Sequence, residues 1–307
     1  MKRKPSRASL GRLSTEKPNP ASKNLDLKSS LEIARIINAE DGKVARAVKS
    51  PLREIARAID IIATALRRGG RLIYVGAGTS GRIAALDAAE CPPTFNTDPR
   101  MVQFVIAGGT KALASAVEGN EDSRKLGERE ISRKKPGKND VVVGIAASGR
   151  TPFTIAAIQY ARRHSAKTIA VTCNRGSQLA KAAHVAIVTD VGPEVIAGSS
   201  RMKAGTAQKM VLNILSTGAM TRLGYVYGNL MVNVHLKNEK LVERGITILQ
   251  KATGVGRATA GKMLRAAGSV PAALVMFHAA VSRADAARAL RAAKGNVRAG
   301  IAAARSL

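Results

Sequence analysis

Residues 72–81 read Leu-Ile-Tyr-Val-Gly-Ala-Gly-Thr-Ser-Gly, a short apolar run that passes directly into a glycine-rich turn. A run this apolar suits a strand that is buried on both faces, as strands of parallel sheets are. The turn opens a helix, so backbone N–H groups and the positive end of the helix dipole can bind an anion there. The stretch therefore predicts a strand, an anion-binding loop and a helix in succession.

Four similar runs follow along the chain, and helical patterns separate several of them. The runs are Val102–Ile106, Val141–Ile145, Thr168–Thr172 and Val185–Val188, and the helical patterns are Ile83–Glu90, Lys111–Val117 and Thr154–Arg163. This order predicts an α/β fold, a doubly wound, five-stranded parallel sheet with right-handed crossovers. Ligands of such sheets bind at the carboxyl ends of the strands.

Helical segments flank the predicted sheet on both sides. Apolar residues at three- and four-residue spacing predict two amphipathic helices between Ser29 and Arg68, and a long helix is expected from about Ser200 to Leu223. The Ala-rich stretch from Gly245 to Ala304 predicts a small helical bundle. We expect a basic, disordered tail at residues 1–28, a sheet domain with N-terminal helices at 29–225, and a C-terminal helical region at 226–307.

The chain is strongly basic, with 50 Lys and Arg against 21 Asp and Glu and a net charge of +29. Such a charge favours anionic partners without naming them. Aromatic residues make up only 3% of the chain and Trp is absent, so the stacking groups that nucleic-acid binding uses are scarce and we expect no nucleic-acid partner. No secretory leader and no membrane-spanning run is expected, which predicts a cytoplasmic protein.

Hydroxyl side chains gather in loops that follow predicted strands. After the third strand the chain reads Ala-Ala-Ser-Gly-Arg-Thr-Pro (146–152), and Gly-Ser-Ser-Arg-Met-Lys (198–203) precedes the long helix. The first loop also fits a dinucleotide fingerprint, but Ala107-Gly108-Gly109 stands where that fingerprint needs an acidic residue. The three loops together indicate a sugar phosphate, whereas each loop alone is also explained by capping serines.

Carboxylates occur at two places near these loops. Glu90 directly precedes Cys91-Pro92-Pro93 at the expected end of a helix, and Glu118 and Glu121 follow the second crossover segment. Two carboxylates in different environments can deliver one proton and remove another, although the spacing alone favours ordinary surface carboxylates. The four histidines and two cysteines show no metal-ligand spacing, so we expect neither a metal nor another cofactor.

Several motifs together resemble one known family, the N-acetylmuramic acid 6-phosphate etherases, which belong to the sugar isomerase (SIS) domain proteins. The motifs are Gly76–Arg82, Glu90–Thr94, Val117–Ser123, Ala146–Pro152 and Gly198–Lys209. The resemblance implies a flavodoxin-like SIS domain and cleavage of the D-lactyl ether of N-acetylmuramic acid 6-phosphate during cell-wall recycling. It also implies a homodimer with the site near the subunit interface, and a C-terminal region similar to ubiquitin-associated bundles.

The same resemblance assigns roles to individual residues. Glu90 matches the general acid that protonates the departing lactate oxygen, and Glu121 matches the base that removes the C2 proton. The residues assigned to phosphate and sugar hydroxyls are Thr79, Ser80, Ser148, Thr151, Ser199 and Ser200, with Glu118 and Lys203 as weaker candidates. Asn120 and Asn96 depart from the residues that the family often has at these positions.

Three rival functions share the phosphosugar module. The first is a non-catalytic sugar-phosphate-binding regulator of the glucokinase-regulatory type, against which the presence of both Glu90 and Glu121 argues. The second is an aldose–ketose isomerase, which would release no lactate. The third is a transcriptional regulator, which would need a helix-turn-helix domain that residues 1–60 do not suggest.

Overall fold

The computed structural model describes residues 14–306 except 116 and 237, and it describes the backbone but not the side chain of Glu118. The described chain forms two compact units. The first holds the residues up to Ala88 together with Arg100–Ser216, and the second holds Ala89–Pro99 with the residues from Thr217 onward. The predicted boundary at 225/226 thus lies nine residues beyond the division at 216/217.

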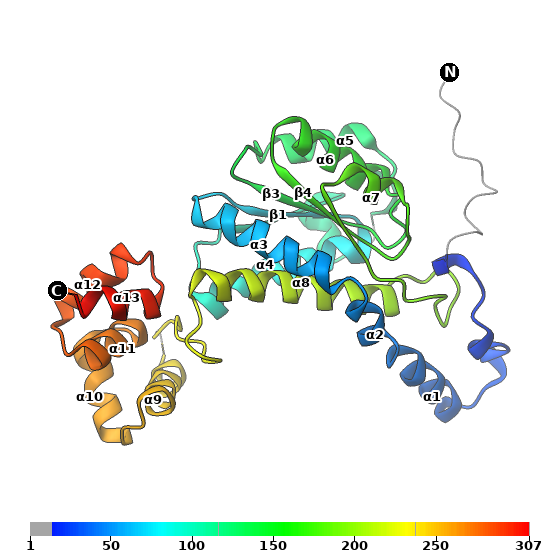
Figure 1. Ribbon diagram of the computed structural model, residues 1–307. Coiled ribbons are helices and arrows are strands. Elements are labelled where there is room, and N and C mark those ends of the chain that lie inside the picture. The colour runs from blue at the N-terminus through cyan, green and yellow to red at the C-terminus, as the bar shows by residue number, and fades with distance from the viewer. Residues whose placement is uncertain (1–13, 116, 237, 307) are drawn as a thin grey trace. The chain divides into compact units, whose positions relative to one another are not determined.

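The first unit is built on a five-stranded, all-parallel sheet of order β2-β1-β3-β4-β5 (Figure 1). Its strands are β1 (Leu72–Gly76), β2 (Val102–Ile106), β3 (Val141–Ile145), β4 (Lys167–Thr172) and β5 (Val185–Val188). Gly76 pairs with Ile106 on one side and with Ile145 on the other, which aligns the carboxyl ends of the three strands. The predicted sheet is confirmed, because uninterrupted apolar runs such as β1 and β3 are buried along their whole length.

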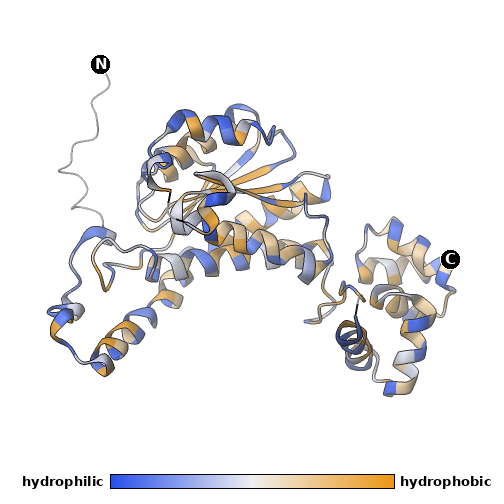
Figure 2. Cartoon of the chain, turned by 180° about the vertical axis from the view of Figure 1, so that it is seen from behind, coloured by the Kyte–Doolittle hydropathy of each residue, from blue (hydrophilic) through white to orange (hydrophobic). Residues whose placement is uncertain are grey.

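Helices cover both faces of this sheet (Figure 1). One face carries α5 (Arg124–Ser132), α6 (Pro152–Arg163) and α7 (Gln178–Ala182), and the other carries α3 (Leu52–Arg67), α4 (Gly78–Phe95) and α8 (Lys203–Leu223). Apolar residues of the strands and α6, such as Val75, Val142 and Phe153, form a common core. Figure 2 shows the strands as a largely hydrophobic layer between the helices.

The crossover from β2 to β3 differs from the prediction. The expected helix over Lys111–Val117 is replaced by two 3-10 turns, η5 (Gly109–Leu113) and η6 (Glu118–Asn120), and the helical part of the crossover is α5. The Ser123 side chain caps α5 by accepting a hydrogen bond from Leu126 N at 3.1 Å. A Cβ on Gly127 would stand 2.2 Å from the carbonyl oxygen of Phe153, so glycine lets α5 approach α6 closely. Because the sequence of α5 is mostly polar, it lacks the apolar pattern from which a helix is predicted.

Helix α4 also runs further than predicted. The pattern placed its end at Glu90, but the helix continues through Pro92 and Pro93 to Phe95. Proline has a φ that suits a helix, although inside a helix it lacks the N–H for a hydrogen bond and its ring crowds the carbonyl group four residues earlier. Glu90 therefore does not stand in the last turn of its helix.

The N-terminal residues 14–28, here called the strap, correct the predicted disordered tail. They form the 3-10 turns η2 (Ser14–Glu16), η3 (Pro20–Ser22) and η4 (Leu25–Leu27), whereas residues 1–13 of the predicted tail lie outside the described part of the chain. Asn19 Nδ2 donates to the carbonyl oxygen of Pro193 at 3.1 Å, and Ser22 Oγ donates to that of Val195 at 2.7 Å. These partners are more than 170 positions away, and local composition cannot indicate such contacts.

After the strap come three helices instead of the predicted two. They are α1 (Ser30–Asp41), α2 (Val44–Lys49) and α3, and Gly42 and Pro51 stand at the junctions between them. At the start of α1, the Ser29 hydroxyl and the Glu32 carboxylate form a reciprocal capping box. Leu27 and Leu31 leave 79% and 59% of their surface exposed, so this part of the chain presents apolar side chains to its surroundings.

The second unit contains the predicted helical bundle. Its helices are α9 (Glu239–Thr253), α10 (Arg257–Ala267), α11 (Val270–Ala279), α12 (Arg283–Ala292) and α13 (Val297–Ala304). They enclose a core of their own that includes Leu249, Leu264 and Leu274. Among the described residues, no helix combines the length and apolar composition that crossing a bilayer requires.

Candidate functional site

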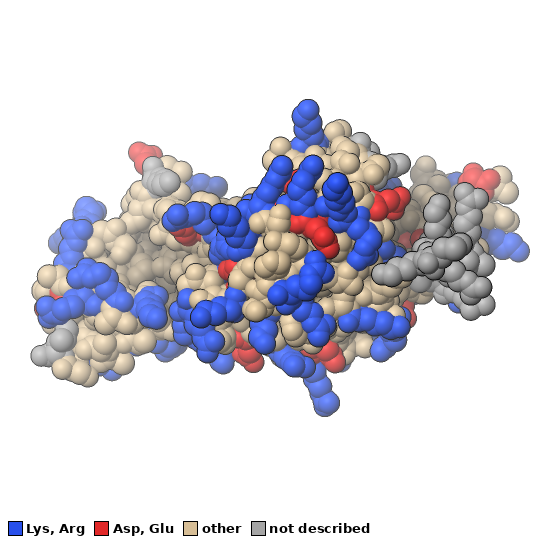
Figure 3. Space-filling model, turned by 90° about the horizontal axis from the view of Figure 1, so that it is seen from above, with Lys and Arg blue, Asp and Glu red and all other residues tan. Residues whose placement is uncertain are grey.

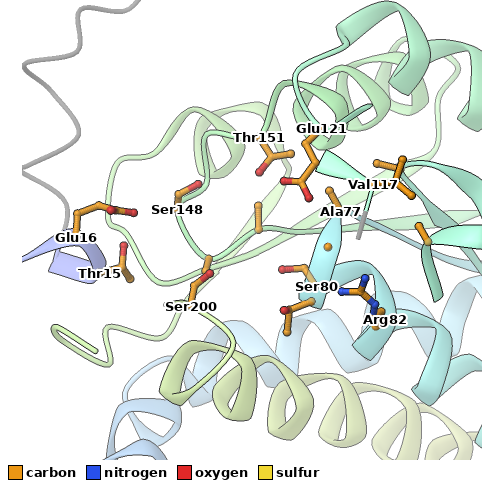
Figure 4. A pocket seen from close by; sticks show the side chains of 16 residues that line it. Thr15, Glu16, Ala77, Ser80, Arg82, Val117, Glu121, Ser148, Thr151 and Ser200 are labelled. Carbon is orange, nitrogen blue, oxygen red and sulfur yellow. The ribbon is translucent and has the colours of Figure 1, made fainter. Parts of the chain in front are cut away.

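A cavity of about 360 Å³ opens at the carboxyl ends of the strands of the first unit (Figure 4). Its wall comes from the segments after β1, β2 and β3, from the loop before α8, and from the strap. The lining residues are Thr15, Glu16, Ala77, Gly78, Thr79, Ser80, Arg82, Ala107, Ala112, Val117, Glu121, Ala146, Ala147, Ser148, Thr151 and Ser200. Five of the predicted hydroxyl residues line it: Thr79, Ser80, Ser148, Thr151 and Ser200.

The first turn of α4 forms one side of the cavity. Gly78 has a φ of +52°, a conformation that side chains rarely tolerate, and a Cβ there would stand 2.9 Å from Oε1 of Glu121. Glycine thus lets the chain turn into the helix and lets the Glu121 carboxylate lie against the start of α4. The N–H groups of a first helical turn have no partner within the helix, so they are available to an anion.

Ser80 is tied to α8 by a buried hydrogen bond. Ser80 Oγ and Gln208 Oε1 are 2.9 Å apart, and Gln208 is only 1% exposed. The amide nitrogen of Gln208 has no hydrogen-bond partner among the described residues. If the amide is turned by half a rotation, its nitrogen donates to Ser80 Oγ and the Ser80 hydroxyl proton becomes available to a ligand.

The loop between β3 and α6 supplies two more hydroxyl groups. Thr151 is the N-cap residue of α6, but its side chain makes no capping hydrogen bond. Ser148 Oγ accepts a hydrogen bond from Arg150 N at 3.2 Å, which leaves its own hydrogen for a ligand. Capping serines alone therefore do not explain this loop.

The loop before α8 brings Ser200 to the cavity, whereas Ser199 is not among the lining residues. Glu194, fully buried in this loop, accepts hydrogen bonds from Lys203 N at 3.0 Å and Ala204 N at 2.9 Å and so caps α8. Burial raises the pKa of Glu194, although these two backbone N–H groups partly oppose that rise.

Lys203, a predicted substrate contact, is not among the residues that line the cavity. Its side chain is 1% exposed, and its ammonium group forms an ion pair with Glu40, which also binds Lys43. Burial acts to raise the pKa of Glu40, but hydrogen bonds from Lys203, Lys43 and Asn19 prevail and lower it to about 2. Lys203 is thus a structural residue, and its partner, 163 positions away, leaves no trace in the local sequence.

The predicted carboxylates have different positions. Glu121 lines the cavity, and its backbone oxygen accepts a hydrogen bond from Phe153 N at 3.0 Å, which ties it to the start of α6. Glu90 is exposed on α4 and is not among the lining residues. Ten residues separate it from Ser80, or about 15 Å along the helix axis. The side chain of Glu118 lies outside the described part of the structure.

Three lining residues with polar side chains were not predicted from the sequence: Thr15, Glu16 and Arg82. Arg82 donates from Nε and Nη2 to the carbonyl oxygens of Leu113 and Ser115, at 3.2 and 2.8 Å, and stands at the end of the motif 76–82. Its position in that motif, one turn into the helix, is a signal that could have identified it. Thr15 and Glu16 offered no such signal, because the strap was expected to be disordered.

In the described part of the chain, no group of three or more His, Cys, Asp or Glu side chains is arranged to hold a metal ion. The polar groups of the cavity are hydroxyls, backbone N–H groups, one guanidinium and two carboxylates. Such a set can bind a polar anion and can move protons.

Comparison with known proteins agrees with this architecture. Residues 54–162 match the model of the glucokinase regulatory protein N-terminal SIS domain, and residues 135–217 match the SIS domain model. Among solved structures, the phosphoheptose isomerases of Francisella tularensis and Neisseria gonorrhoeae superpose with TM-scores of 0.51 and 0.50. Each covers 63% of this chain and all of the other chain at 18% identity, so these two matches support the fold alone.

Curated relatives extend the likeness to nearly the whole chain. The chain is 57% identical over 274 residues to the N-acetylmuramic acid 6-phosphate etherase of Symbiobacterium thermophilum, which covers 89% of this chain and 91% of the relative. It is 49% identical over 290 residues to the protein of the same name from Klebsiella aerogenes, with coverage of 94% and 97%. The predicted SIS fold is confirmed.

Proposed function

The chain belongs to the family of N-acetylmuramic acid 6-phosphate etherases, and from that premise we propose that it cleaves the D-lactyl ether of N-acetylmuramic acid 6-phosphate. The products are N-acetylglucosamine 6-phosphate and D-lactate, and the reaction serves the recycling of peptidoglycan amino sugars in the cytoplasm. The observation that carries the proposal is the cavity at the carboxyl ends of the strands, where Glu121 stands among hydroxyl groups and a helix N-terminus.

The anion-binding groups of the cavity suit the phosphate of this substrate. The first turn of α4, whose N–H groups have no partner within the helix, lies beside Ser80, and Thr151 begins α6 with a hydroxyl that does not cap the helix. Arg82 adds a positive charge to the same wall. We propose that the phosphate lies at these two helix ends.

Glu121 is the proposed general base, and its place among the residues that line the cavity supports this role. In the open-chain sugar the C1 aldehyde acidifies the proton on C2, and a carboxylate can remove that proton. Electrons of the C2–H bond then form a C2–C3 double bond while the C3–O bond to lactate breaks, and the leaving oxygen takes a proton from an acid. Addition of water to the double bond, with hydroxyl at C3 and hydrogen at C2, completes the product.

Glu90 is the proposed acid, and we infer that it reaches the cavity of a second copy of the chain. Within its own chain it stands ten residues along α4 from Ser80 and is exposed. Leu86, one turn earlier on the same face of α4, leaves 50% of its surface exposed, and Ile83 on this face is half-buried. An exposed apolar stripe that ends in a carboxylate suits a homodimer interface.

The decisive experiment is D-lactate release from N-acetylmuramic acid 6-phosphate, with the unphosphorylated sugar as control. We expect lactate from the phosphorylated sugar alone, and Glu121→Gln should reduce the rate at least about a hundredfold, because a general base contributes that much. Binding without lactate release would contradict the etherase and favour the sugar-phosphate-binding regulator, a reading that the match of residues 54–162 also allows.

A further inference from the structure

The strap brings two residues to the cavity that the proposed reaction does not yet use, Thr15 and Glu16. The strap is fixed there by contacts with distant parts of the first unit. Gly198 N donates to the carbonyl oxygen of Thr15 at 3.1 Å, and Ser14 Oγ donates to Oδ1 of Asn174 at 3.3 Å. The hydrogen bonds of Asn19 and Ser22 to the loop before α8 hold the rest of the strap. Thr15 and Glu16 are therefore held in fixed positions in the wall of the cavity.

Glu16 places a carboxylate in a cavity most of whose other polar groups suit an anion. Its Oε2 faces Gly198, and no ion pair among the described residues engages its carboxylate. A negative charge here repels a phosphate that approaches this wall. In Figure 4 Glu16 and Thr15 lie on the side of the cavity away from Ser80 and Arg82. The side of the cavity that holds Ser80 and Arg82 offers a positive charge to an anion, with the Glu121 carboxylate beside it, whereas the side that holds Glu16 has a negative charge and no Lys or Arg among the lining residues.

Thr15 provides a second, independent indication of a ligand at this wall. The residue is 1% exposed, and its hydroxyl oxygen has no hydrogen-bond partner among the described residues. A buried hydroxyl without a partner is unfavourable, and such groups in native structures call for an explanation. A ligand group that enters beside the strap, with a small shift of the strap, would provide the partner.

We propose that Thr15 and Glu16 form a subsite for the uncharged hydrogen-bonding groups of the substrate, the hydroxyl and amide N–H groups of an open-chain amino sugar. A carboxylate accepts hydrogen bonds from such donors, and the Thr15 hydroxyl can either donate or accept. The phosphate then lies on the far side, at the first turn of α4. This subsite rests on the proposed function. It gives the strap, which the sequence predicts to be a tail, the role of selecting and orienting the sugar.

The test compares two ligands, N-acetylglucosamine 6-phosphate and inorganic phosphate, by calorimetric titration of the full chain. Glu16→Ala should weaken binding of the sugar phosphate at least about tenfold, because a hydrogen bond to a charged group is lost. The same change should leave the affinity for inorganic phosphate unchanged or increase it, because a repulsive charge is removed. Thr15→Val, which keeps the shape of the side chain, should weaken only the sugar phosphate.

Two further variants separate this subsite from general effects. Asp26→Ala removes the same charge from an exposed position on the strap outside the cavity, and it should change neither affinity. Ser80→Ala should weaken both ligands, because it acts on the phosphate side. Equal losses for both ligands in Glu16→Ala, or no loss for either, would overturn the subsite. A wild-type protein that binds the sugar phosphate but releases no lactate would contradict the proposed reaction and leave this comparison valid.

Discussion

The hydrogen bond between Ser80 and Gln208 can run in two directions, and only one of them lets Ser80 bind an anion. When Ser80 donates its proton to the amide oxygen, nothing is left to donate to a phosphate oxygen. When the amide nitrogen donates to Ser80 Oγ, the hydroxyl proton can go to the ligand. The second direction also gives a partner to the amide nitrogen, which otherwise has none in the described part of the chain. We therefore expect Gln208 to orient the Ser80 hydroxyl when ligand binds.

The variant Gln208→Glu tests this orientation. A carboxylate of the same shape can only accept, so it would hold the Ser80 proton, and its charge would also repel phosphate. We expect affinity for N-acetylglucosamine 6-phosphate to fall at least about tenfold at pH 8, and to approach the wild-type value as acid protonates the new side chain. Titrations of the wild type and the variant across pH 5–8 measure the ratio of their affinities. Gln208→Met, which neither accepts nor adds charge, should lose less, and an equal loss in the two variants would refute the orienting role.

Some site residues follow from local sequence and others do not. Ser80, Ser148 and Thr151 were predicted because each directly follows a buried strand, and parallel strands bring their carboxyl ends to one edge. Lys203 was predicted but does not line the cavity, whereas Thr15 and Glu16 line it and were not predicted. The surroundings of these residues depend on partners more than 160 positions away. Local patterns carry no information about such contacts.

At the scale of the elements, the fold depends on the buried ion pair between Glu40 on α1 and Lys203 on α8. Breaking such a pair by removing one partner leaves an uncompensated buried charge and commonly costs about 3–5 kcal/mol. We expect Lys203→Met to lower the free energy of unfolding by about 3 kcal/mol, since Lys43 and Asn19 still contact Glu40. Urea denaturation measures this change in the free energy of unfolding. The matched control is Lys181→Met, which alters an exposed lysine.

The same pair predicts how stability responds to acid. The folded pKa of Glu40 is about 2 against an ordinary value of 4.5, so its contribution is complete above pH 4.5 and is lost as pH falls toward 2. That difference corresponds to about 3 kcal/mol. The free energy of unfolding should therefore fall more steeply between pH 5 and 3 in the wild type than in Glu40→Gln. Parallel slopes would show that Glu40 is not the responsible group.

Among the elements, the five strands were predictable to within one residue, and several helices were not. Strands such as β3 are uninterrupted apolar runs that nothing but a buried sheet explains. Helix α5 was missed because only Gly127 and Ile131 of its nine residues are buried, so the packing that stabilises it barely marks the sequence. The end of α4 was misplaced because two prolines normally signal a break, yet here the helix tolerates both.

At the scale of the whole molecule, the net charge of the chain is opposite in sign to that of the proposed substrate. The face shown in Figure 3 carries many more Lys and Arg side chains than Asp and Glu. A net charge of +29 attracts an anionic sugar phosphate over a distance that shrinks as salt rises. Specific binding nevertheless depends on the cavity, because the charge is spread along the chain.

A site shared between two copies predicts complementation between inactive variants. Glu90→Gln and Glu121→Gln should each be nearly inactive alone. After the two are unfolded together and refolded, about half of the dimers would be mixed, and each mixed dimer would have one intact site of two. Lactate release should therefore recover to about one quarter of the wild-type rate. A mixture that stays inactive, although mixed dimers are detected, would place Glu90 in the cavity of its own chain.

The attachment of the strap to the loop before α8 also determines when the strap can take its place during biosynthesis. Asn19 and Ser22 are made 174 and 173 residues before their partners Pro193 and Val195. At about 5–20 residues per second, the strap waits roughly 10–35 s before the segment that holds it has been translated. Its polar composition, rich in Lys, Ser, Asn and Pro, suits a segment that must remain unpaired for that time without aggregating. The strap side of the cavity is thus synthesised well before the segment that holds it in place.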